Sequence, residues 1–486
     1  MAQATAAGPV APRPVVSGNR LLDATTGQPL RVAGVNRSGS EYACIQGWGI
    51  FDGPVDDTSL DAIASWHTNA VRVPLNEDCW LGINGVSGAY GGTAYRDAIT
   101  RLVSRLHAHG LAAVLDLHWA APGATRATSQ QVAPDADHAV DFWRRVAGRF
   151  RRDPSVMFEL FNEPRDISWS CWRNGCTTAA GWKATGAQQL VGAVRNAGAR
   201  QPIIVDGLNW GGDLSGWGAH APSDPQHQLV AGWHIYSFSG CSTATCWNQT
   251  AAPLARTYPV LLTEVGEDDC GTGFLDTILP WADSHHVGYL AWSWNTASCG
   301  GGPALISDYS GSPTAFGAGY RRHLAALAGS GGAGQPQPAP APLDPAALFD
   351  FEDGTTQGWA TRWGALGVAP EQGVAFSGSH GLALAVPGAG YPAAGVDTNL
   401  ARVTPGSTVT YRLWAPPDVG ISVSPMVLDQ DWQASVLAAR PVVPGWNTVR
   451  FTVPTGLGGV RVLGLQVDDA SGWSGTVDVD DVTVTP

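Results

Sequence analysis

The sequence is poor in charged residues and contains almost no lysine. Of its 486 residues 14% are charged, Lys183 is the single lysine, and the formal net charge is -13. Proteins that bind a nucleic-acid backbone carry clustered Lys and Arg side chains, and this chain has no basic run. We therefore expect no nucleic-acid partner.

Long apolar runs are also lacking. No segment reaches the roughly 18 to 20 consecutive apolar residues that span a bilayer. The N-terminus does not show the charged-then-apolar pattern of a signal peptide. Met1 instead precedes a run of small residues, as it would if a start methionine had replaced the signal of an exported protein. We expect a soluble, secreted protein with no membrane partner.

Cysteine is missing from the last third of the chain. The first two thirds contain all eight cysteines: Cys44, Cys79, Cys171, Cys176, Cys241, Cys246, Cys270 and Cys299. The third and fourth enclose a short polar loop, as do the fifth and sixth, which is typical of disulfides in exported proteins. By elimination the remaining pairs would be Cys44 with Cys79 and Cys270 with Cys299, one of many connectivities that eight cysteines allow. A zinc site is disfavoured, because the spacing is not C-x2-C and no histidine pair accompanies it.

The composition divides the chain into three parts. Residues 15–328 alternate between strand-like and helix-like apolar patterns, residues 329–345 are rich in Gly, Pro and Ala, and residues 346–486 contain short alternating segments. The middle part predicts a linker, flexible at its Gly end and extended at its Pro-Ala end. The last part predicts a β-sandwich, jelly-roll-like, with strands at 408–414, 421–428, 448–453, 461–467 and 476–484.

The first part predicts a (β/α)8 barrel. After a small hairpin at 15–30, apolar strand patterns fall at 31–36, 70–75, 111–118, 156–163, 202–206, 229–234, 260–264 and 287–292. Helix patterns between and after them fall at 59–67, 94–109, 137–150, 180–199, 274–285 and 315–327. Eight strands that alternate with helices over about 300 residues have the size and order of this fold. A doubly wound sheet is the alternative, and it is disfavoured because no glycine-rich phosphate loop follows any strand.

The fourth predicted strand ends in an unusual way. The apolar run that begins at Val156 stops at Asn162, Glu163 and Pro164. A carboxylate where a buried strand leaves the core costs free energy unless it is paired or its pKa is shifted. Taken alone, Glu163 could equally cap a turn.

The other strands also end in polar or aromatic residues. In chain order these strand-end residues are Asn36, Arg72, His118, Asn162, Glu163, His234, Tyr236, Glu264 and Trp292. Because the active site of such a barrel lies at the carboxyl ends of its strands, we expect these side chains to share one mouth. Carboxylates on the fourth and seventh strands suit the roughly 5 to 5.5 Å separation of a retaining glycosidase. An Arg and a Tyr beside one glutamate would keep it ionised, while the other would keep its proton.

These motifs resemble glycoside hydrolase family 5, over about residues 30 to 325. They are NAVRVPL, LDLHW, FELFNEP, GWHIYSF, LLTEVGE and LAWSWN. The resemblance implies that Glu163 is the general acid/base, Glu264 is the nucleophile and Asn162 bonds the sugar 2-hydroxyl. It further implies that Arg72 and Tyr236 orient Glu264.

The resemblance also assigns the lining of the sugar site and implies no catalytic cofactor or metal in the barrel. His118 and His234 would line the subsite, with Trp292 as its floor. Taken alone, His118 would be an ordinary buried histidine and Arg72 a structural ion-pair partner; the ordered set of strand-end residues favours the functional interpretation. Asp116 and Asp206 lie within predicted strands, and we expect no catalysis from them.

Tryptophans fall into two groups by position. Those expected to fill the core or to lie behind the site are Trp119, Trp233 and Trp294. Those in loops after strands, where stacking on sugar and core packing are equally consistent with position, are Trp48, Trp80, Trp169, Trp172, Trp210, Trp217 and Trp247. We take Trp210 as a substrate-binding candidate. The two short cysteine loops, 168–176 and 239–246, would form disulfide-pinned walls of the cleft.

The β-sandwich resembles the carbohydrate-binding modules appended to such enzymes. Asp350, Glu352 and Asp480 or Asp481 could together bind a structural calcium ion, and acidic turns without an ion are the alternative. Aromatic candidates for sugar contact are Trp363, Tyr391, Trp432 and Trp473. We expect Trp446 to pack in the core.

The preferred interpretation is a secreted, monomeric, retaining β-glycosidase, by default within the family an endo-β-1,4-glucanase. A β-diglycosidase of the rutinosidase type, which releases a disaccharide from an aryl glucoside, and a β-mannanase are the enzymatic alternatives. The alternative from another class is a non-catalytic carbohydrate-binding protein on a barrel scaffold. It is disfavoured because such a protein would not need both glutamates.

Overall fold

The computed structural model describes residues 10–297, 302–329, 347–364, 367–372, 375–377, 380–388, 390–415, 421–443, 445–469 and 474–485. The chain divides into two compact units, Met1–Ala325 and Ala326–Pro486. The predicted linker lies almost wholly outside the described residues. None of the helices in the described ranges is long and apolar enough to cross a membrane.

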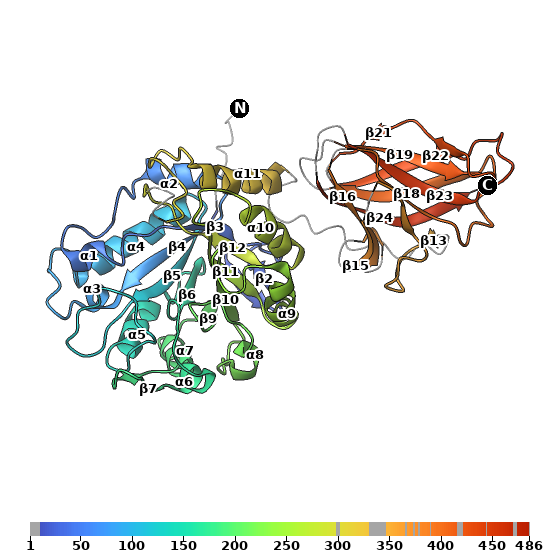
Figure 1. The fold of residues 1–486 in the computed structure, drawn as a ribbon. Coiled ribbons are helices and arrows are strands. Elements are labelled where there is room, and N and C mark those ends of the chain that lie inside the picture. The colour runs from blue at the N-terminus through green and yellow to red at the C-terminus, as the bar shows by residue number, and fades with distance from the viewer. Residues whose placement is uncertain are drawn as a thin grey trace, which may run out of the picture. The chain divides into compact units, whose positions relative to one another are not determined.

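The first unit is a closed barrel of eight parallel strands, as the sequence predicts (Figure 1). Its strands are β3 (Ala33–Asn36), β4 (Ala70–Asn76), β5 (Ala112–Trp119), β6 (Val156–Glu159), β9 (Ile203–Asp206), β10 (Leu229–Tyr236), β11 (Val260–Gly266) and β12 (Gly288–Ala291). Each pairs with its neighbour in chain order, and β12 pairs with β3 to close the ring. The fourth and seventh strands of the barrel are therefore β6 and β11.

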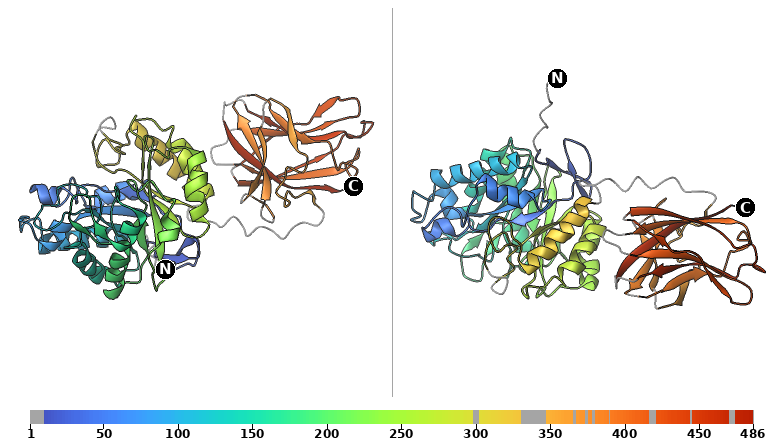
Figure 2. Two further views of the ribbon diagram at one scale, coloured as in Figure 1. Left: turned by 60° about the horizontal axis from the view of Figure 1, so that its bottom comes forward. Right: turned by 90° about the horizontal axis from the view of Figure 1, so that it is seen from above.

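Helices surround this barrel, as both views of Figure 2 show. They are α1 (Ala43–Gln46), α2 (Asp57–Ala64), α3 (Glu77–Leu81), α4 (Thr93–Ala108), α5 (Ala139–Phe150), α6 (Trp169–Asn174), α7 (Ala187–Asn196), α8 (Trp217–His220), α9 (Ala244–Ala255), α10 (Leu275–Ser284) and α11 (Ala315–Gly329). Helix α5 shows why these segments dock on strands: Phe142, Trp143, Val146 and Phe150 fall on one face and are all buried. The short helices α3 and α6 were not predicted. Each starts at a side-chain cap, Asn76 for α3 and Ser168 for α6.

The hairpin at the start of the chain closes one end of the barrel. It consists of β1 (Pro14–Ser17) and β2 (Arg20–Asp23), paired antiparallel. Leu21 is buried in one cluster with the first residues of the barrel strands, including Ala70, Met157 and Leu261. Because these residues lie at the amino ends of their strands, the hairpin covers the end opposite the strand-end polar residues.

The fourth strand is shorter than predicted. It ends at Glu159, whereas the apolar pattern runs on to residue 163. The next residues still bond to neighbouring strands, since the N–H of Leu160 donates to the carbonyl of Ile204 and that of Asn162 donates to Leu117. Glu163 then adopts a left-handed backbone with φ of 52°. The chain thus leaves the barrel with Asn162 and Glu163 at its rim.

Three disulfides of the first unit have both cysteines within the described residues. Cys44 of α1 is bonded to Cys79 of α3, which connects the segments after β3 and β4. The two short loops are closed as expected, one by Cys171 with Cys176 and one by Cys241 with Cys246. Cys270 is disulfide-bonded as well. Its expected partner, Cys299, lies outside the described residues.

The second unit is a sandwich of two antiparallel sheets, as predicted. One sheet contains β13 (Ala347–Phe349), β15 (Gly367–Gln372), β16 (His380–Pro387), β18 (Thr408–Ala415), β22 (Gly445–Thr452) and β24 (Ser474–Thr485). The other contains β14 (Ala360–Trp363), β17 (Ala393–Val396), β19 (Ser422–Leu428), β20 (Ala434–Val436), β21 (Arg440–Pro441) and β23 (Val462–Asp468). Buried residues alternate strictly along β18, and Val409, Tyr411 and Leu413 face the core between the sheets.

The structure corrects one prediction for this unit: Trp446 is half-buried against the ring of Phe376 instead of lying in the core. The calcium site stays a prediction. Among the described residues, Asp350, Glu352 and Asp480 do not form one cluster of ligand atoms. The carboxylate of Glu352 accepts the N–H of His380, and that of Asp480 accepts the N–H of Phe376.

Candidate active site

Arg72 organises the mouth of the barrel. Its side chain is fully buried in β4 and donates five hydrogen bonds of 2.7 to 2.9 Å. Two reach Glu159, and one each reaches Asn36, Glu264 and Asn162. A guanidinium has five N–H groups, so every one is used. Arg72 therefore holds side chains at the carboxyl ends of β3, β6 and β11 in one rigid array.

Glu264 is held at both carboxylate oxygens. Its Oε1 accepts a bond from Nη1 of Arg72 at 2.7 Å, and its Oε2 accepts the hydroxyl of Tyr236 at 2.5 Å. The pKa of Tyr236 lies well above its usual range, because burial and the neighbouring Glu264 both disfavour a phenolate. Tyr236 consequently keeps its phenolic proton around neutral pH and donates its hydrogen bond to Glu264 there.

Glu163 lies opposite, with donors of a different kind. Its Oε1 is 3.1 Å from Nδ1 of His234, and its Oε2 accepts a bond from the amide of Gln130 at 2.8 Å. Nδ1 of His234 is also 3.5 Å from Oε2 of Glu264. Ligand atoms of these two glutamates and His234 all lie within 4.8 Å of one another. The two carboxylates therefore face each other closely across one imidazole.

The pKa of Glu163 differs from the prediction. Burial raises it, but the hydrogen bond and charge of His234 and the amide of Gln130 outweigh burial, so the pKa of Glu163 is lowered. His234 exerts this effect because it is itself held as a cation. Burial alone would lower the pKa of His234, yet Glu264, Asp206 and two further hydrogen bonds to carboxylates raise it well above its usual value.

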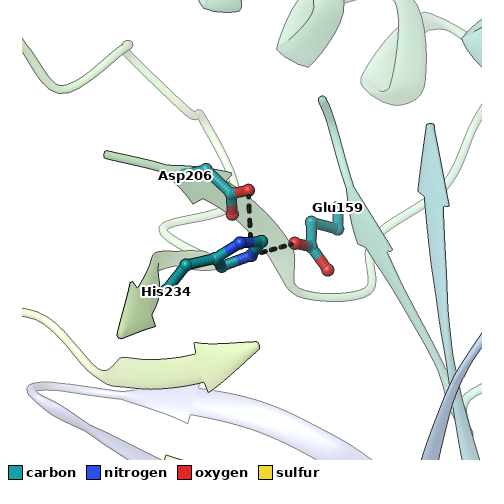
Figure 3. A group of neighbouring side chains, drawn as sticks. All are labelled: Glu159, Asp206 and His234. Carbon is teal, nitrogen blue, oxygen red and sulfur yellow. Dashed lines mark ion pairs between the residues drawn. The ribbon is translucent and has the colours of Figure 1, made fainter. Parts of the chain in front are cut away.

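The far side of His234 faces two acidic residues that sequence reasoning did not assign to the site. Figure 3 shows the imidazole between Asp206 of β9 and Glu159 of β6. Its Nε2 is 3.4 Å from Oδ2 of Asp206 and 3.7 Å from Oε1 of Glu159, and 3.0 Å from the hydroxyl of Thr263. Glu159, paired with Arg72, has a lowered pKa despite its burial. Burial and the charge of Glu159 instead raise the pKa of Asp206 well above its usual range.

Asp116 belongs to the same buried network. Its Oδ2 is 3.0 Å from Nη2 of Arg72 and 2.7 Å from Nδ1 of His118. Burial raises the pKa of Asp116 well above its usual range. The sequence does contain a sign that Asp116, Glu159 and Asp206 belong to a buried network. All three are acidic residues within apolar strand patterns, where a carboxylate needs a partner.

His118 and Trp292 lie side by side at the rim. Their rings stack with centroids 5.5 Å apart and an interplanar angle of 8°. Burial and the charge of Arg72 lower the pKa of His118, which keeps this imidazole neutral. His118 is buried and Trp292 is half-buried, so the indole, backed by the neutral imidazole, provides a flat surface beside the two carboxylates.

The loop tryptophans separate by burial. Trp80, Trp172, Trp217 and Trp247 are buried and cannot stack on a ligand, whereas Trp48 and Trp210 are each 50% exposed and Trp169 is half-buried. Trp233 and Trp294 are buried as expected. Trp210 lies over the guanidinium of Arg165, whose carbon is 3.7 Å from the ring centroid. Arg165 also contacts the carbonyl of Glu163 at 3.4 Å, so this exposed indole lies near the Glu163 side of the mouth.

The mouth of the barrel contains side chains of the kinds that bind metal ions. In the parts of the chain that the structure covers, two groups of three could hold a metal: Glu159, Asp206 and His234, and Glu163, His234 and Glu264. Both contain His234, which carries a proton and a positive charge here. A histidine must be neutral to bind a metal ion. The surrounding carboxylates favour the cationic form of His234, so this donor set does not fit a resident metal.

Two facing carboxylates at the carboxyl ends of β6 and β11, one of them held by an Arg and a Tyr, define a (β/α)8 glycoside hydrolase of the retaining class. Residues 24–298 match the family model described as Cellulase (glycosyl hydrolase family 5). The chain belongs to this family.

Named relatives are identical to the chain at about a quarter of the aligned positions. A mannan endo-1,4-beta-mannosidase of Salipaludibacillus agaradhaerens is 24% identical over 285 residues, which are 57% of this chain and 80% of the relative. One of Streptomyces lividans is 26% identical over 61% of this chain and 69% of the relative. Endoglucanase E-5 of Thermobifida fusca is 23% identical over 58% and 55%. A beta-glucanase structure from Saccharophagus degradans shares the fold, with a TM-score of 0.51 and 20% identity over 65% of this chain and 94% of that chain.

Proposed function

We propose that the chain hydrolyses β-1,4-linked glucan by double displacement, with Glu264 as nucleophile and Glu163 as general acid/base. The observation that carries this proposal is the close approach of the two carboxylates, whose oxygens lie within 4.8 Å of each other in the cluster with His234. An inverting enzyme needs a wider separation, because a water molecule must fit between its base and the sugar. The separation here leaves no room for that water.

Glu264 suits the nucleophile because Arg72 and Tyr236 each hold one of its oxygens, which fixes the direction of the carboxylate. In the first step its carboxylate attacks the anomeric carbon, the glycosidic C–O bond breaks, and the proton of Glu163 passes to the leaving oxygen. In the second step Glu163 takes a proton from water, the water oxygen attacks the same carbon, and the ester bond to Glu264 breaks.

Glu163 must be protonated for the first step, although the free site favours its carboxylate. Burial is the largest single influence on its pKa and acts to raise it. A sugar that fills the mouth removes further water and increases this influence. Substrate binding thus prepares the acid form, and formation of the ester at Glu264 removes a negative charge and prepares the base form.

Asn162 supports recognition of the sugar beside the cleaved bond. Its Oδ1 accepts a bond from Arg72 at 2.7 Å, and its buried Nδ2 has no hydrogen-bond partner among the described residues. A buried amide donor without a partner costs free energy, which a ligand hydroxyl can recover. We assign the 2-hydroxyl of the sugar to this donor.

The substrate class rests on the aromatic surfaces and on the family. The flat faces of Trp292 and Trp210 suit a chain of equatorial sugars, whose C–H groups pack on rings. β-1,4-Mannan is the second candidate, favoured by the two relatives named as mannan endo-1,4-beta-mannosidases. The disulfides fit an oxidising compartment, and we propose secretion.

A substrate panel tests this proposal. The panel contains carboxymethyl cellulose, β-mannan and an aryl rutinoside, with products sized over time. Long oligosaccharides from the glucan are expected. Cleavage of mannan alone would select the second candidate, and release of an intact disaccharide from the aryl rutinoside would show a diglycosidase.

We further propose that the β-sandwich binds carbohydrate. Tyr391 and Trp432 are 67% and 53% exposed, so both rings are open to stack on a sugar. A chain that ends at residue 328 should hydrolyse soluble substrates at the full rate and lose retention on insoluble cellulose. Equal retention of both chains on cellulose would contradict this role.

A further inference from the structure

Asp206 occupies a central but unexplained position. It is the last residue of β9, its side chain is buried, and its Oδ1 has no hydrogen-bond partner in the described ranges. Its Oδ2 accepts the backbone N–H of Glu163 at 3.3 Å and lies 3.4 Å from Nε2 of His234. One carboxyl oxygen therefore contacts both the backbone of Glu163 and the imidazole that bonds the Glu163 side chain.

The neighbouring strand leaves space for this side chain. Gly232 of β10 is the register partner of Asp206, and a Cβ at Gly232 would lie 2.1 Å from Oδ1 of Asp206. No residue larger than glycine fits there while Asp206 keeps its place. The two positions together direct the carboxyl group of Asp206 toward His234, which lies further along the same strand as Gly232. Figure 3 shows this carboxyl group beside the imidazole.

Glu163 needs such support because of its backbone. Its φ of 52° lies in the left-handed region, which a residue with a side chain rarely adopts. A strained conformation persists only where surrounding contacts hold it. The bond from its N–H to Asp206 is one such contact, and the bond from Arg165 to its carbonyl is another.

We propose that Asp206 is a positioning residue for Glu163: it holds the backbone N–H of Glu163 and the imidazole of His234 that bonds the Glu163 carboxylate. The inference rests on the proposed acid/base role of Glu163. The carboxyl groups of Glu159 in β6 and Glu264 in β11 also face His234. Asp206 differs from them because it also accepts the backbone N–H of Glu163.

Leaving-group dependence tests this inference, because loss of general acid catalysis slows substrates with poor leaving groups most. Phenyl β-cellobioside needs the acid, while 2,4-dinitrophenyl β-cellobioside does not. In Asp206→Ala we expect kcat/KM to fall about 30-fold or more on the phenyl substrate and less than about threefold on the dinitrophenyl substrate. Equal losses on both substrates, or no loss on either, would overturn the inference.

Asp206→Asn separates the two contacts from charge. Asn keeps an acceptor oxygen for the Glu163 N–H and cannot ionise, so this variant keeps the contact without a carboxylate charge. It should retain the ratio of the two substrates within about threefold. A ratio like that of Asp206→Ala would contradict the positioning role.

Two controls keep the outcome specific. Asp224→Ala removes another buried aspartate, which pairs with Arg195 away from the mouth, and should leave the substrate ratio unchanged. Glu163→Ala must show the leaving-group dependence by itself. If Glu163→Ala shows it and Asp206→Ala does not, the inference fails alone; if Glu163→Ala shows none, the proposed function fails and the inference with it. Where Asp206→Ala does not fold, Asp206→Leu fills the space without an acceptor, and the same outcomes apply.

Discussion

The hydroxyl of Tyr236 donates a hydrogen bond to Oε2 of Glu264 at 2.5 Å. It is the only donor in the described structure that reaches this oxygen at hydrogen-bond distance, since Arg72 bonds Oε1 and His234 stands at 3.5 Å. Tyr236 therefore helps to fix the direction of the proposed nucleophile.

Tyr236→Phe should lower kcat/KM about 10- to 100-fold, because a hydrogen bond to a charged group contributes about 1.5 to 3 kcal/mol. Steady-state kinetics on 2,4-dinitrophenyl β-cellobioside measures the loss. Tyr258→Phe is the matched control, since Tyr258 packs against Trp217 outside the site. A Tyr236→Phe variant as fast as wild type would show that Arg72 alone suffices.

Trp210→Ala should raise KM about tenfold with a smaller change in kcat, since stacking on an exposed indole contributes to binding and not to bond cleavage. Kinetics on a soluble glucan gives both constants. Phe376→Ala in the sandwich is a matched control, because this ring is also partly exposed and lies over an arginine, Arg412. The two variants should differ on soluble substrate, and equal KM values would remove Trp210 from the site.

Glu77→Gln should stabilise the protein more strongly as pH rises. Glu77 is buried next to Asp135, and burial together with that charge raises the pKa of Glu77 well above its usual value. The folded state thus keeps a proton that the unfolded state has lost above about pH 4.5, so wild-type stability falls as pH rises through this window. Gln cannot ionise and can donate a hydrogen bond to the carboxylate of Asp135, as the protonated Glu77 does.

Denaturant unfolding at pH 5 and pH 8 measures this effect. The stability difference between Glu77→Gln and wild type should grow by about 1 kcal/mol or more between the two. Parallel stabilities at both pH values would contradict the raised pKa of Glu77.

The barrel could be predicted from sequence because each strand carries its own apolar pattern and each ends in a polar or aromatic residue. The contacts of Arg72 and Tyr236 with Glu264 also followed, since the carboxyl ends of parallel strands must meet. Asp206 was set aside because placement within a strand does not reveal that its side chain faces the mouth. That fact depends on Gly232 in the next strand, which only the register identifies.

The lowered pKa of Glu163 could not be predicted from its own segment. It depends on the charge of His234, which in turn depends on acidic residues from three other strands. A pattern along one strand cannot report a sum of charges across the barrel. The exposed fractions of Trp80 and Trp210 illustrate the same limit, because both lie in loops after strands and only one faces solvent.

The most direct test of the account is the reaction of Glu264→Ala with azide. Without its nucleophile the variant should hydrolyse 2,4-dinitrophenyl β-cellobioside more than about a thousandfold more slowly than wild type. Azide should enter the space of the lost carboxylate and restore turnover, with an α-glycosyl azide as the product, because attack comes from the face opposite the leaving group. An unchanged rate in Glu264→Ala, or a β-glycosyl azide as its product, would contradict the assignment of Glu264 as the nucleophile.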